Sequence, residues 1–290
     1  MKTLYKHILV LFILCAFNVF NLTAQVPPFK NIKVLKGKNN YSVRTIYQDK
    51  TGYLWFGTNL GLVRFDGINN ILFNQKDSLA DDIVTALCED KQNQLWIGHK
   101  NGKITIHSKQ TGFVRFDPEE GIGDKEISSI VVDSSGTVWF STLGEGIYYY
   151  KNKRLYNVNV DDGLLDNYCY CLSIDNKQNV WVGTDAGISI YTLKNKSIES
   201  ISMKDGLPDN IVKSIVFSEK GSAWIGMEEG GITNYNTIKK IFTPLTDWKF
   251  GSISSMVFGD KQNLWIAAPN TGLVNVDLSK PNINFQVYIL

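Results

Sequence analysis

Few side chains in this sequence could carry out acid–base, nucleophilic or metal chemistry. Past the N-terminal region the histidines are His99 and His107, and the cysteines are Cys88, Cys169 and Cys171. No Gly-x-Ser-x-Gly motif, phosphate-binding loop or metal-spaced set of His and Cys accompanies them. Three scattered cysteines also do not make a disulfide framework. We therefore predict no catalytic residue, no metal site and no cofactor.

The cysteines are better explained as small buried hydrophobic residues. Cys169 and Cys171 lie two residues apart in a strand-like run. Because side chains alternate along a strand, we expect both to point to one face of the sheet.

A regular set of carboxylates also has a structural explanation. Aspartates lie six residues before each of four tryptophans, at Asp49, Asp90, Asp133 and Asp175. Residues repeated at one register are spread around the fold, so they cannot form the paired carboxylates of an acid–base site. Asp commonly hydrogen-bonds to backbone N–H groups in turns. We expect these four to fix hairpins.

Polar residues lie at a second register, eleven residues before each of six tryptophans. They are Arg44, Thr85, Ser128, Tyr170, Lys213 and Ser254. The neighbouring registers, twelve and nine residues before each Trp, are apolar throughout. Two cations, three hydroxyls and a tyrosine would suit a polar, neutral-to-anionic ligand such as a sugar or a uronate. Alternatively, these groups solvate a water-filled channel and cap loop carbonyls.

A loop shortly after each Trp varies in type while its surroundings stay constant. Variable loops on a rigid scaffold are where binding specificity usually lies. The candidate ligand-binding residues from this loop are Asn59, His99, Lys100, Asp185, Glu228 and Asn270. The same variation in residue type is also typical of a surface loop that binds nothing.

The six tryptophans form a regularly spaced series, the Trp ladder. The strands and turns that carry the polar positions repeat with the same spacing. The tryptophans are Trp55, Trp96, Trp139, Trp181, Trp224 and Trp265. Each repeat predicts a buried strand, a hairpin, a strand centred on the Trp, a Gly-containing turn and two more strands. Four short antiparallel strands in a repeat of roughly 42 residues are typical of a β-propeller blade. A sandwich needs no such period, and a β-helix has a shorter one.

The N-terminus has the three parts of a secretory signal. Lys2 and Lys6 precede the apolar run from Ile8 to Phe20, and Ala24 ends a small-residue exit. The apolar run is shorter than the roughly 20 residues that span a bilayer. We predict a signal peptide over 1–24, a propeller over 25–290 without a later transmembrane helix, and export to the periplasm. Without the two lysines the formal net charge falls from +2 to 0, so nucleic acid is not an expected partner.

The repeats resemble the two-component regulator propeller repeat. The Leu-Trp-Ile-Gly-Thr-like strands carry this resemblance, together with linkers such as Asp205-Gly206-Leu207-Pro208 and Asp162-Gly163-Leu164-Leu165. The linker Glu120-Gly121-Ile122-Gly123-Asp124 is a weaker copy, and Lys76-Asp77-Ser78-Leu79 lacks the glycine. In that family the propeller is the periplasmic sensing part of a receptor that also carries a membrane helix and a histidine kinase.

The resemblance implies the input module of a two-component sensor, without kinase output in this chain. Its partners would be a small polar ligand, with an oligosaccharide as the expected class, and a sensor kinase or a missing C-terminal portion of the receptor. The alternative is a protein-interaction scaffold. A propeller lyase is the enzymatic rival, because Trp139-Phe140-Ser141-Thr142 resembles strands of streptogramin lyases.

The number of predicted strands affects how the ring of blades would close. The segment from Phe29 to Leu35 looks like a strand that would complete the last blade, yet the sixth repeat already has its own fourth strand near Phe285–Val287. A seven-bladed ring whose last blade includes residues beyond 290 would absorb the extra strand. A six-bladed ring with a spare strand is the alternative. An open ring would leave unpaired edges and an uncovered blade face.

Overall fold

The computed structural model describes residues 32–35, 37–279 and 283–288. The predicted signal peptide, 1–24, lies outside the described residues. So do residues 29–31 of the expected N-terminal strand, and its described part, 32–35, forms no strand. Residues 34–290 make one compact unit. No helix in the described part of the chain is long and apolar enough to cross a membrane.

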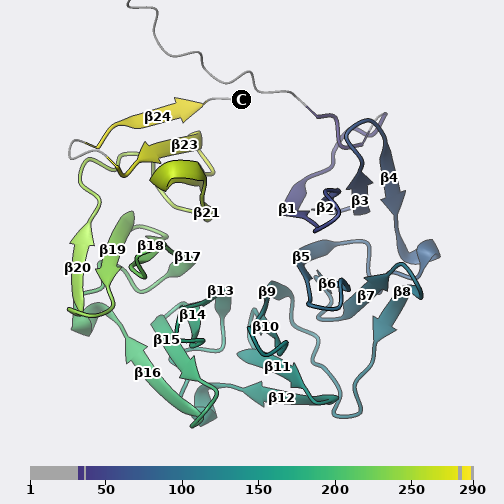
Figure 1. The fold of residues 1–290 in the computed structure, drawn as a ribbon, viewed down its shortest axis with the longest axis horizontal. Coiled ribbons are helices and arrows are strands. Elements are labelled where there is room, and N and C mark those ends of the chain that lie inside the picture. Colours follow the sequence, from purple (N-terminus) through teal and green to yellow (C-terminus); the bar gives the residue numbers. More distant parts are fainter. Residues whose placement is uncertain (1–31, 36, 280–282, 289–290) are drawn as a thin grey trace, which may run out of the picture. The chain divides into compact units, whose positions relative to one another are not determined.

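This unit is a β-propeller of six blades, as the Trp ladder predicts (Figure 1). Each blade is a four-stranded antiparallel sheet in which sequential strands pair. Blades 1 to 3 comprise β1 (Val43–Gln48), β2 (Leu54–Thr58), β3 (Gly61–Phe65) and β4 (Asn70–Phe73); β5 (Val84–Glu89), β6 (Leu95–His99), β7 (Ile104–Ser108) and β8 (Gly112–Phe116); and β9 (Ile127–Val132), β10 (Val138–Thr142), β11 (Ile147–Lys151) and β12 (Arg154–Val158). Blades 4 to 6 comprise β13 (Cys169–Ile174), β14 (Val180–Thr184), β15 (Gly187–Thr192) and β16 (Ser197–Ile201); β17 (Val212–Phe217), β18 (Ala223–Met227), β19 (Ile232–Asn236) and β20 (Ile241–Pro244); and β21 (Ser255–Phe258), β22 (Asn263–Ala268), β23 (Gly272–Asp277) and β24 (Phe285–Tyr288).

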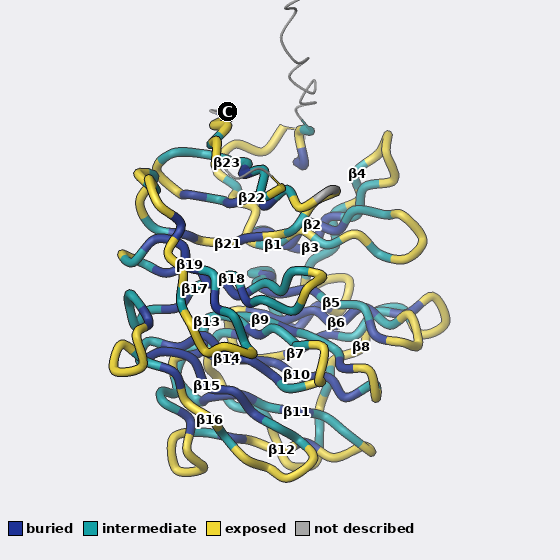
Figure 2. The backbone as a smooth tube through the Cα atoms, turned by 60° about the vertical axis from the view of Figure 1, so that its left-hand side comes forward, coloured by how far each residue is buried: buried dark blue, intermediate teal, exposed yellow. Residues whose placement is uncertain are grey.

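The first strand of each blade lies nearest the central axis (Figure 1). Because consecutive strands are antiparallel, the turn after the first strand and the turn after the third lie at one end of every blade, which we call the hairpin end. The turn after the second strand and the linker to the next blade lie at the other end, the linker end. Figure 2 shows the strands of the interior as largely buried and the turns at both ends as largely exposed.

The repeated aspartates fix the hairpins, which confirms the structural prediction for them. In blade 3, Oδ1 of Asp133 accepts hydrogen bonds from the backbone N–H groups of Ser135 and Thr137, at 2.8 and 2.9 Å. Its Oδ2 accepts the indole N–H of Trp139 at 3.1 Å. The indole N–H of Trp55, Trp96 and Trp181 reaches the matching aspartate at 2.8 to 3.1 Å. The aspartate thus ties the hairpin to the Trp of the second strand.

The linkers after blades 1, 3 and 4 form short 3₁₀ turns at η1 (Gln75–Asp77), η2 (Val160–Asp162) and η3 (Met203–Asp205). The turn η4 (Asp260–Gln262) lies in a hairpin of blade 6. In η3, Asp205 accepts the backbone N–H of Ser202 at 2.9 Å, closing a capping box. Gly206 then turns the chain with a φ of 96°, and Leu207 is buried between blades 4 and 5. The linker after blade 1 makes the same turn with Ser78, at a φ of 77°.

Five hydrophobic clusters join consecutive blades, from blades 1 and 2 to blades 5 and 6. Close approach depends on the small residue two positions after each Trp. A Cβ added to Gly183 would lie 2.8 Å from Cγ1 of Val212 in the next blade. Such a distance is far below ordinary van der Waals contact, so glycine is required there. The prediction that this small residue admits the next sheet is confirmed.

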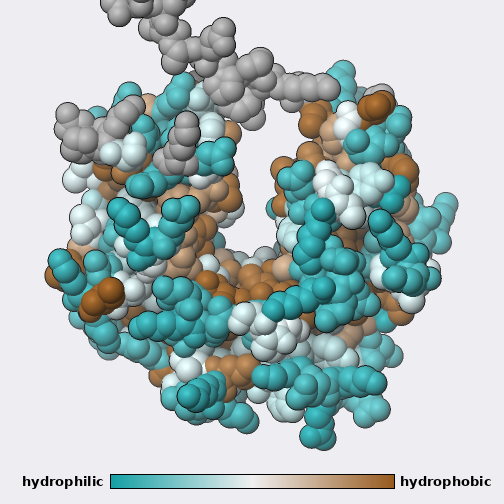
Figure 3. Space-filling model, in the orientation of Figure 1, coloured by the Kyte–Doolittle hydropathy of each residue, from teal (hydrophilic) through white to brown (hydrophobic). Residues whose placement is uncertain are grey.

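Blades 6 and 1 face each other without such a cluster among the described residues. Ile46 of β1 is 61% exposed, whereas Ile130 at the same register of β9 is 5% exposed. Val257 of β21 is 60% exposed. Figures 1 and 3 show an opening between these two blades. The apolar registers of blade 1 are therefore not buried as the sequence pattern predicted. A seventh blade in this ring stays a prediction.

The cysteines illustrate a second correction. Cys169 packs in the cluster between blades 3 and 4, whereas Cys171 packs against the cluster between blades 4 and 5. The prediction that both point to one face is wrong because β13 has a β-bulge between them, at Tyr170. A bulge adds a residue and breaks the alternation of side chains.

Candidate functional site

The polar register eleven residues before each Trp coincides with a repeated β-bulge. In β1, Val43 pairs with Thr58 and Thr45 pairs with Gly57, so Arg44 is the extra residue. The same irregularity places Thr85, Ser128, Tyr170 and Lys213 in β5, β9, β13 and β17. Bulges re-aim a side chain relative to the flanking alternation. Repeated on the innermost strands of blades 1 to 5, they turn one side chain per blade toward the axis. In blade 6, Ser254 lies directly before β21.

These side chains gather at one axial cavity of about 440 Å³. All six predicted residues line it: Arg44, Thr85, Ser128, Tyr170, Lys213 and Ser254. Serines at later positions of the innermost strands extend the lining; they are Ser129, Ser173, Ser214 and Ser255. Figure 3 shows the central hollow open toward the viewer. The structure therefore brings together every member of the predicted ring.

The arginine of the ring is held across the axis rather than within its own blade. Nη1 of Arg44 in blade 1 donates a hydrogen bond to Oε1 of Glu126 in blade 3, and the two atoms are 3.2 Å apart. Glu126 lies directly before β9, thirteen residues before Trp139. The carboxylate compensates the charge of the guanidinium while leaving its other N–H groups to the cavity. The pair is partly exposed, so its own contribution to stability is small.

A second charged group lies on the opposite side of the ring. Nζ of Lys213 is 3.3 Å from Oε2 of Glu228 and 3.4 Å from the centre of the Tyr170 ring. The hydroxyl of Tyr170 donates to Oδ1 of Asp185 at 2.6 Å. Burial, together with this hydrogen bond to Asp185, raises the pKa of Tyr170. The phenol therefore stays protonated at neutral pH, so this side of the ring offers donors and acceptors together.

The hydroxyls of the ring differ in their protein partners. Oγ of Ser128 contacts Oγ of Ser141 at 2.8 Å and donates to the carbonyl of Cys169 in the next blade. Ser254 donates to the carbonyl of Ala267 at 3.0 Å. Oγ1 of Thr85, in contrast, is buried with no hydrogen-bond partner in the described part of the chain. A buried hydroxyl without a protein partner is costly unless water or a ligand binds it.

The predicted loop residues separate into two groups. Asp185 and Glu228 reach the ring through Tyr170 and Lys213. Asn59 instead accepts the backbone N–H of Ser42 at 2.8 Å. These side chains, with the exposed Lys100 and Asn270, are not part of the lining of the axial cavity.

His99 is fully buried and does not reach the cavity. Its Nε2 contacts Oγ1 of Thr105 at 2.8 Å, and its Nδ1 has no partner within the described residues. Burial lowers the pKa of His99 to about 4, so the ring is neutral at pH 7. Within the described ranges, no group of three or more His, Cys, Asp or Glu residues is arranged to hold a metal ion.

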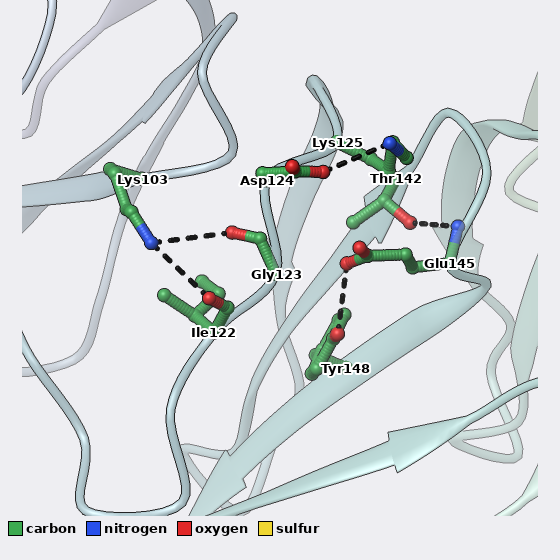
Figure 4. A network of polar contacts seen from close by, with 8 residues as sticks. All are labelled: Lys103, Ile122, Gly123, Asp124, Lys125, Thr142, Glu145 and Tyr148. Carbon is green, nitrogen blue, oxygen red and sulfur yellow. Dashed lines mark hydrogen bonds and ion pairs between the residues drawn. The ribbon is translucent and has the colours of Figure 1, made fainter.

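The linker before Glu126 is held by its own polar network (Figure 4). Nζ of Lys103 donates to the carbonyls of Ile122 and Gly123, at 3.2 and 3.5 Å. Oε2 of Glu145 accepts the hydroxyl of Tyr148 at 3.0 Å. A Cβ on Gly123 would displace the Glu145 carboxylate, which lies against this glycine. The network fixes the segment that presents Glu126 to Arg44.

Glu126 is the site residue that the sequence analysis missed. The register thirteen residues before each Trp reads Ser42, Ile83, Glu126, Tyr168, Ile211 and Ser252. The residue type varies at this register, which lies one residue before the apolar register twelve residues before each Trp. That variation is the signal that could have identified Glu126. The pairing with Arg44 was not predictable, because it spans two blades.

Comparisons with known proteins agree with this architecture. The family model described as two component regulator propeller matches residues 37–60, 78–101, 121–144 and 163–186. A protein named Histidine kinase P4 from Formosa agariphila is 27% identical over 183 residues, which is 55% of this chain and 13% of that protein. The chain thus spans about an eighth of the length of this relative.

Solved structures extend the likeness to the whole ring. The extracellular domain of a putative hybrid two component system from B. thetaiotaomicron is 25% identical, with a TM-score of 0.74, over 87% of this chain and 36% of that one. A virginiamycin B lyase from Staphylococcus aureus is 12% identical, with a TM-score of 0.70, over 87% of this chain and 88% of that one. At that identity the lyase shares the fold alone. The segments that match the two component regulator propeller model lie in blades 1 to 4, and the likeness to the receptor domain covers 87% of the chain.

Proposed function

We propose that this chain is the ligand-sensing propeller of a two-component receptor system, exported to the periplasm, and that it binds a polar oligosaccharide in the axial cavity. The observation that carries the proposal is the repeated bulge, which directs side chains of successive blades into one cavity of about 440 Å³. Concave sites with a few convergent polar groups are typical of small-ligand binding. The likeness to a receptor's extracellular domain supports a sensing role.

The charges around the cavity favour a neutral ligand over a strongly anionic one. Glu126 compensates Arg44, and Glu228 compensates Lys213. A sugar hydroxyl both donates and accepts, so it can bridge a cation and its paired carboxylate. An oligosaccharide satisfies these groups better than a simple anion.

Thermal shift of the purified chain against a panel of neutral and uronate-containing oligosaccharides tests this proposal. A ligand at about 100 times its Kd stabilises the folded state by about 2.7 kcal/mol. Arg44→Ala combined with Lys213→Ala should abolish the shift, and Tyr170→Phe should reduce it. Arg115→Ala combined with Lys239→Ala, at exposed positions away from the axis, is the matched control and should leave the shift unchanged.

A shift that persists in the ring variant would rule out the axial cavity as the binding site. No shift with any glycan, together with specific recovery of a protein partner, would favour the interaction scaffold. The output of the receptor would come from a kinase outside the described propeller. Co-purification with a membrane-bound sensor kinase is the corresponding test.

A further inference from the structure

Pockets also recur at the hairpin end, between neighbouring blades. They lie between blades 1 and 2, blades 3 and 4, and blades 5 and 6, with volumes of about 220, 420 and 260 Å³. The pocket between blades 1 and 2 and the pocket between blades 5 and 6 use equivalent positions. Trp55 lines the first of these two and Trp224 lines the second. Arg64 and Asn234 occupy the same register in them. Comparing these two pockets separates what the fold provides from what particular residues add.

Arg64 distinguishes the pocket between blades 1 and 2. It pairs with Trp55 across β2 and β3. At this register the other blades carry Ile106, Tyr149, Ile190, Asn234 and Asn275. The Arg64 guanidinium carbon lies 4.8 Å from the centre of the Tyr53 ring and 5.8 Å from that of Trp55. Within the described residues the guanidinium has no hydrogen bond or ion pair, so its planar set of N–H donors is open to the pocket.

The acidic residues of this pocket are already engaged elsewhere. Asp49 accepts hydrogen bonds from Thr51, from the backbone N–H of Tyr53 and from the indole of Trp55. Glu89 accepts the backbone N–H of Lys50 at 2.9 Å. Neither carboxylate forms a salt bridge with Arg64. An uncompensated guanidinium over an aromatic wall is the chemistry that recognises a carboxylate attached to an apolar or ring-shaped body.

His107 adds a further aromatic ring to the lining of the same pocket. The ring stacks on Phe113, with centroids 4.3 Å apart, and lies 5.5 Å from the ring of Trp55. Its Nδ1 is buried, so the imidazole contributes packing, and the charged hydrogen-bond donors of the pocket come from Arg64.

We propose that the pocket between blades 1 and 2 binds a small organic carboxylate, with Arg64 as its bidentate partner. Tyr53 and Trp55 contact the body of the ligand. None of the residues that line this pocket lines the axial cavity. The pocket is therefore a second site, separate from the proposed sensing site.

Isothermal titration of the full chain with benzoate tests the proposal, with benzamide as a neutral probe of the same shape. Benzoate should bind saturably, and benzamide should bind at least about tenfold more weakly, because charge-assisted hydrogen bonds are about twice as strong as neutral ones. Arg64→Gln should weaken benzoate binding by at least about tenfold. Arg64→Lys keeps the charge but loses the planar fork, so it should bind benzoate with intermediate affinity. Equal binding of the two probes, no saturable binding, or an unchanged affinity in Arg64→Gln would overturn the proposal.

Three controls keep the result interpretable. Lys220→Ala in the equivalent pocket between blades 5 and 6 should leave benzoate binding unchanged, as should the ring variant Arg44→Ala with Lys213→Ala. Oligosaccharide binding lost in the ring variant but retained in Arg64→Gln would show that the two sites are independent. If Arg64→Gln fails to fold, Arg64→Met keeps a side chain of similar length without the charge. That variant should also weaken benzoate binding by at least about tenfold, and an unchanged affinity would overturn the proposal.

Discussion

Two pairs of blade faces use the same sequence registers but are buried to very different degrees. One pair is the contact between blades 3 and 4, and the other is the facing surfaces of blades 6 and 1. Trp139, Ile147 and Cys169 form a closed cluster between blades 3 and 4. On the open side, Ile46 and Val257 are exposed. The comparison teaches that a repeat supplies an apolar face, and only a neighbouring blade buries it.

The aspartate that ties the hairpin to the Trp does not follow this difference in burial. Blades 1 to 4 hold the Trp indole with an aspartate. Blades 5 and 6 have Ser218 and Gly259 at that position. The tie is thus absent from blade 6, which also has an uncovered face.

The largest expected difference is between two tryptophans. Trp139→Ala removes a fully buried ring and its hydrogen bond to Asp133, and should cost about 3–5 kcal/mol. Trp265→Ala acts on the partly exposed face of blade 6 and should cost less than half as much. Urea unfolding of the two variants measures the difference. Equal losses would mean that the face of blade 6 is covered in solution.

A pair of isoleucines at one register sharpens the test. Ile130→Ala should cost about 2–5 kcal/mol, because it opens a cavity in the cluster between blades 2 and 3. Ile46→Ala removes mostly exposed surface and should cost less than about 0.5 kcal/mol. The midpoint of urea unfolding reports both values. The contrast fails if Ile46→Ala is as damaging as Ile130→Ala.

Acid should weaken the hairpins that Asp49 and Asp133 hold. Burial opposes ionisation of Asp133, but its hydrogen bonds from Ser135, Trp139 and Thr137 outweigh this and lower its pKa; Asp49 is affected in the same way. A carboxylate whose pKa is lower in the folded state stabilises the fold fully above its unfolded pKa, near 4, and loses that effect as the pH falls toward the folded value.

The free energy of unfolding should therefore fall below about pH 4. Asp133→Asn, which cannot titrate, should be less stable at pH 7 and show a shallower loss in acid. Chemical denaturation at a series of pH values measures both slopes. Identical slopes in the two proteins would exclude Asp133 as a contributor.

The smallest expected effect concerns the facing surfaces of blades 6 and 1. Ile46→Glu together with Val257→Glu should change the stability of the open ring by less than about 0.5 kcal/mol, because both positions face solvent. Sedimentation should show less self-association, since the exposed apolar faces become charged. A loss of about 2 kcal/mol or more would instead show that these faces are covered in solution.

Much of the fold was predictable from residues close together in the sequence. The spacing of the tryptophans predicted six four-stranded blades, and the small residue after each Trp predicted close approach of the next sheet. The aspartates were correctly assigned to hairpins because their partners lie two to six residues away. The polar ring was also predictable, as one polar register among apolar ones.

Other features were not predictable from the local pattern. Strand alternation placed Cys169 and Cys171 on one face, but the bulge at Tyr170 separates them. His99 looked like a rim residue, yet it is buried beside Thr105. Each of these errors comes from assuming regular strands and exposed loops.

The sequence by itself determined the repeat, the strand order within each blade and the register of the polar ring, because these depend on local periodicity and turn chemistry. The tertiary structure alone decided that bulges aim the ring inward, that Glu126 meets Arg44 across the axis, and that Ile46 stays exposed. Burial and pairing between blades depend on which surfaces meet in space, and identical repeats have different neighbours at the ends of the array than in its middle.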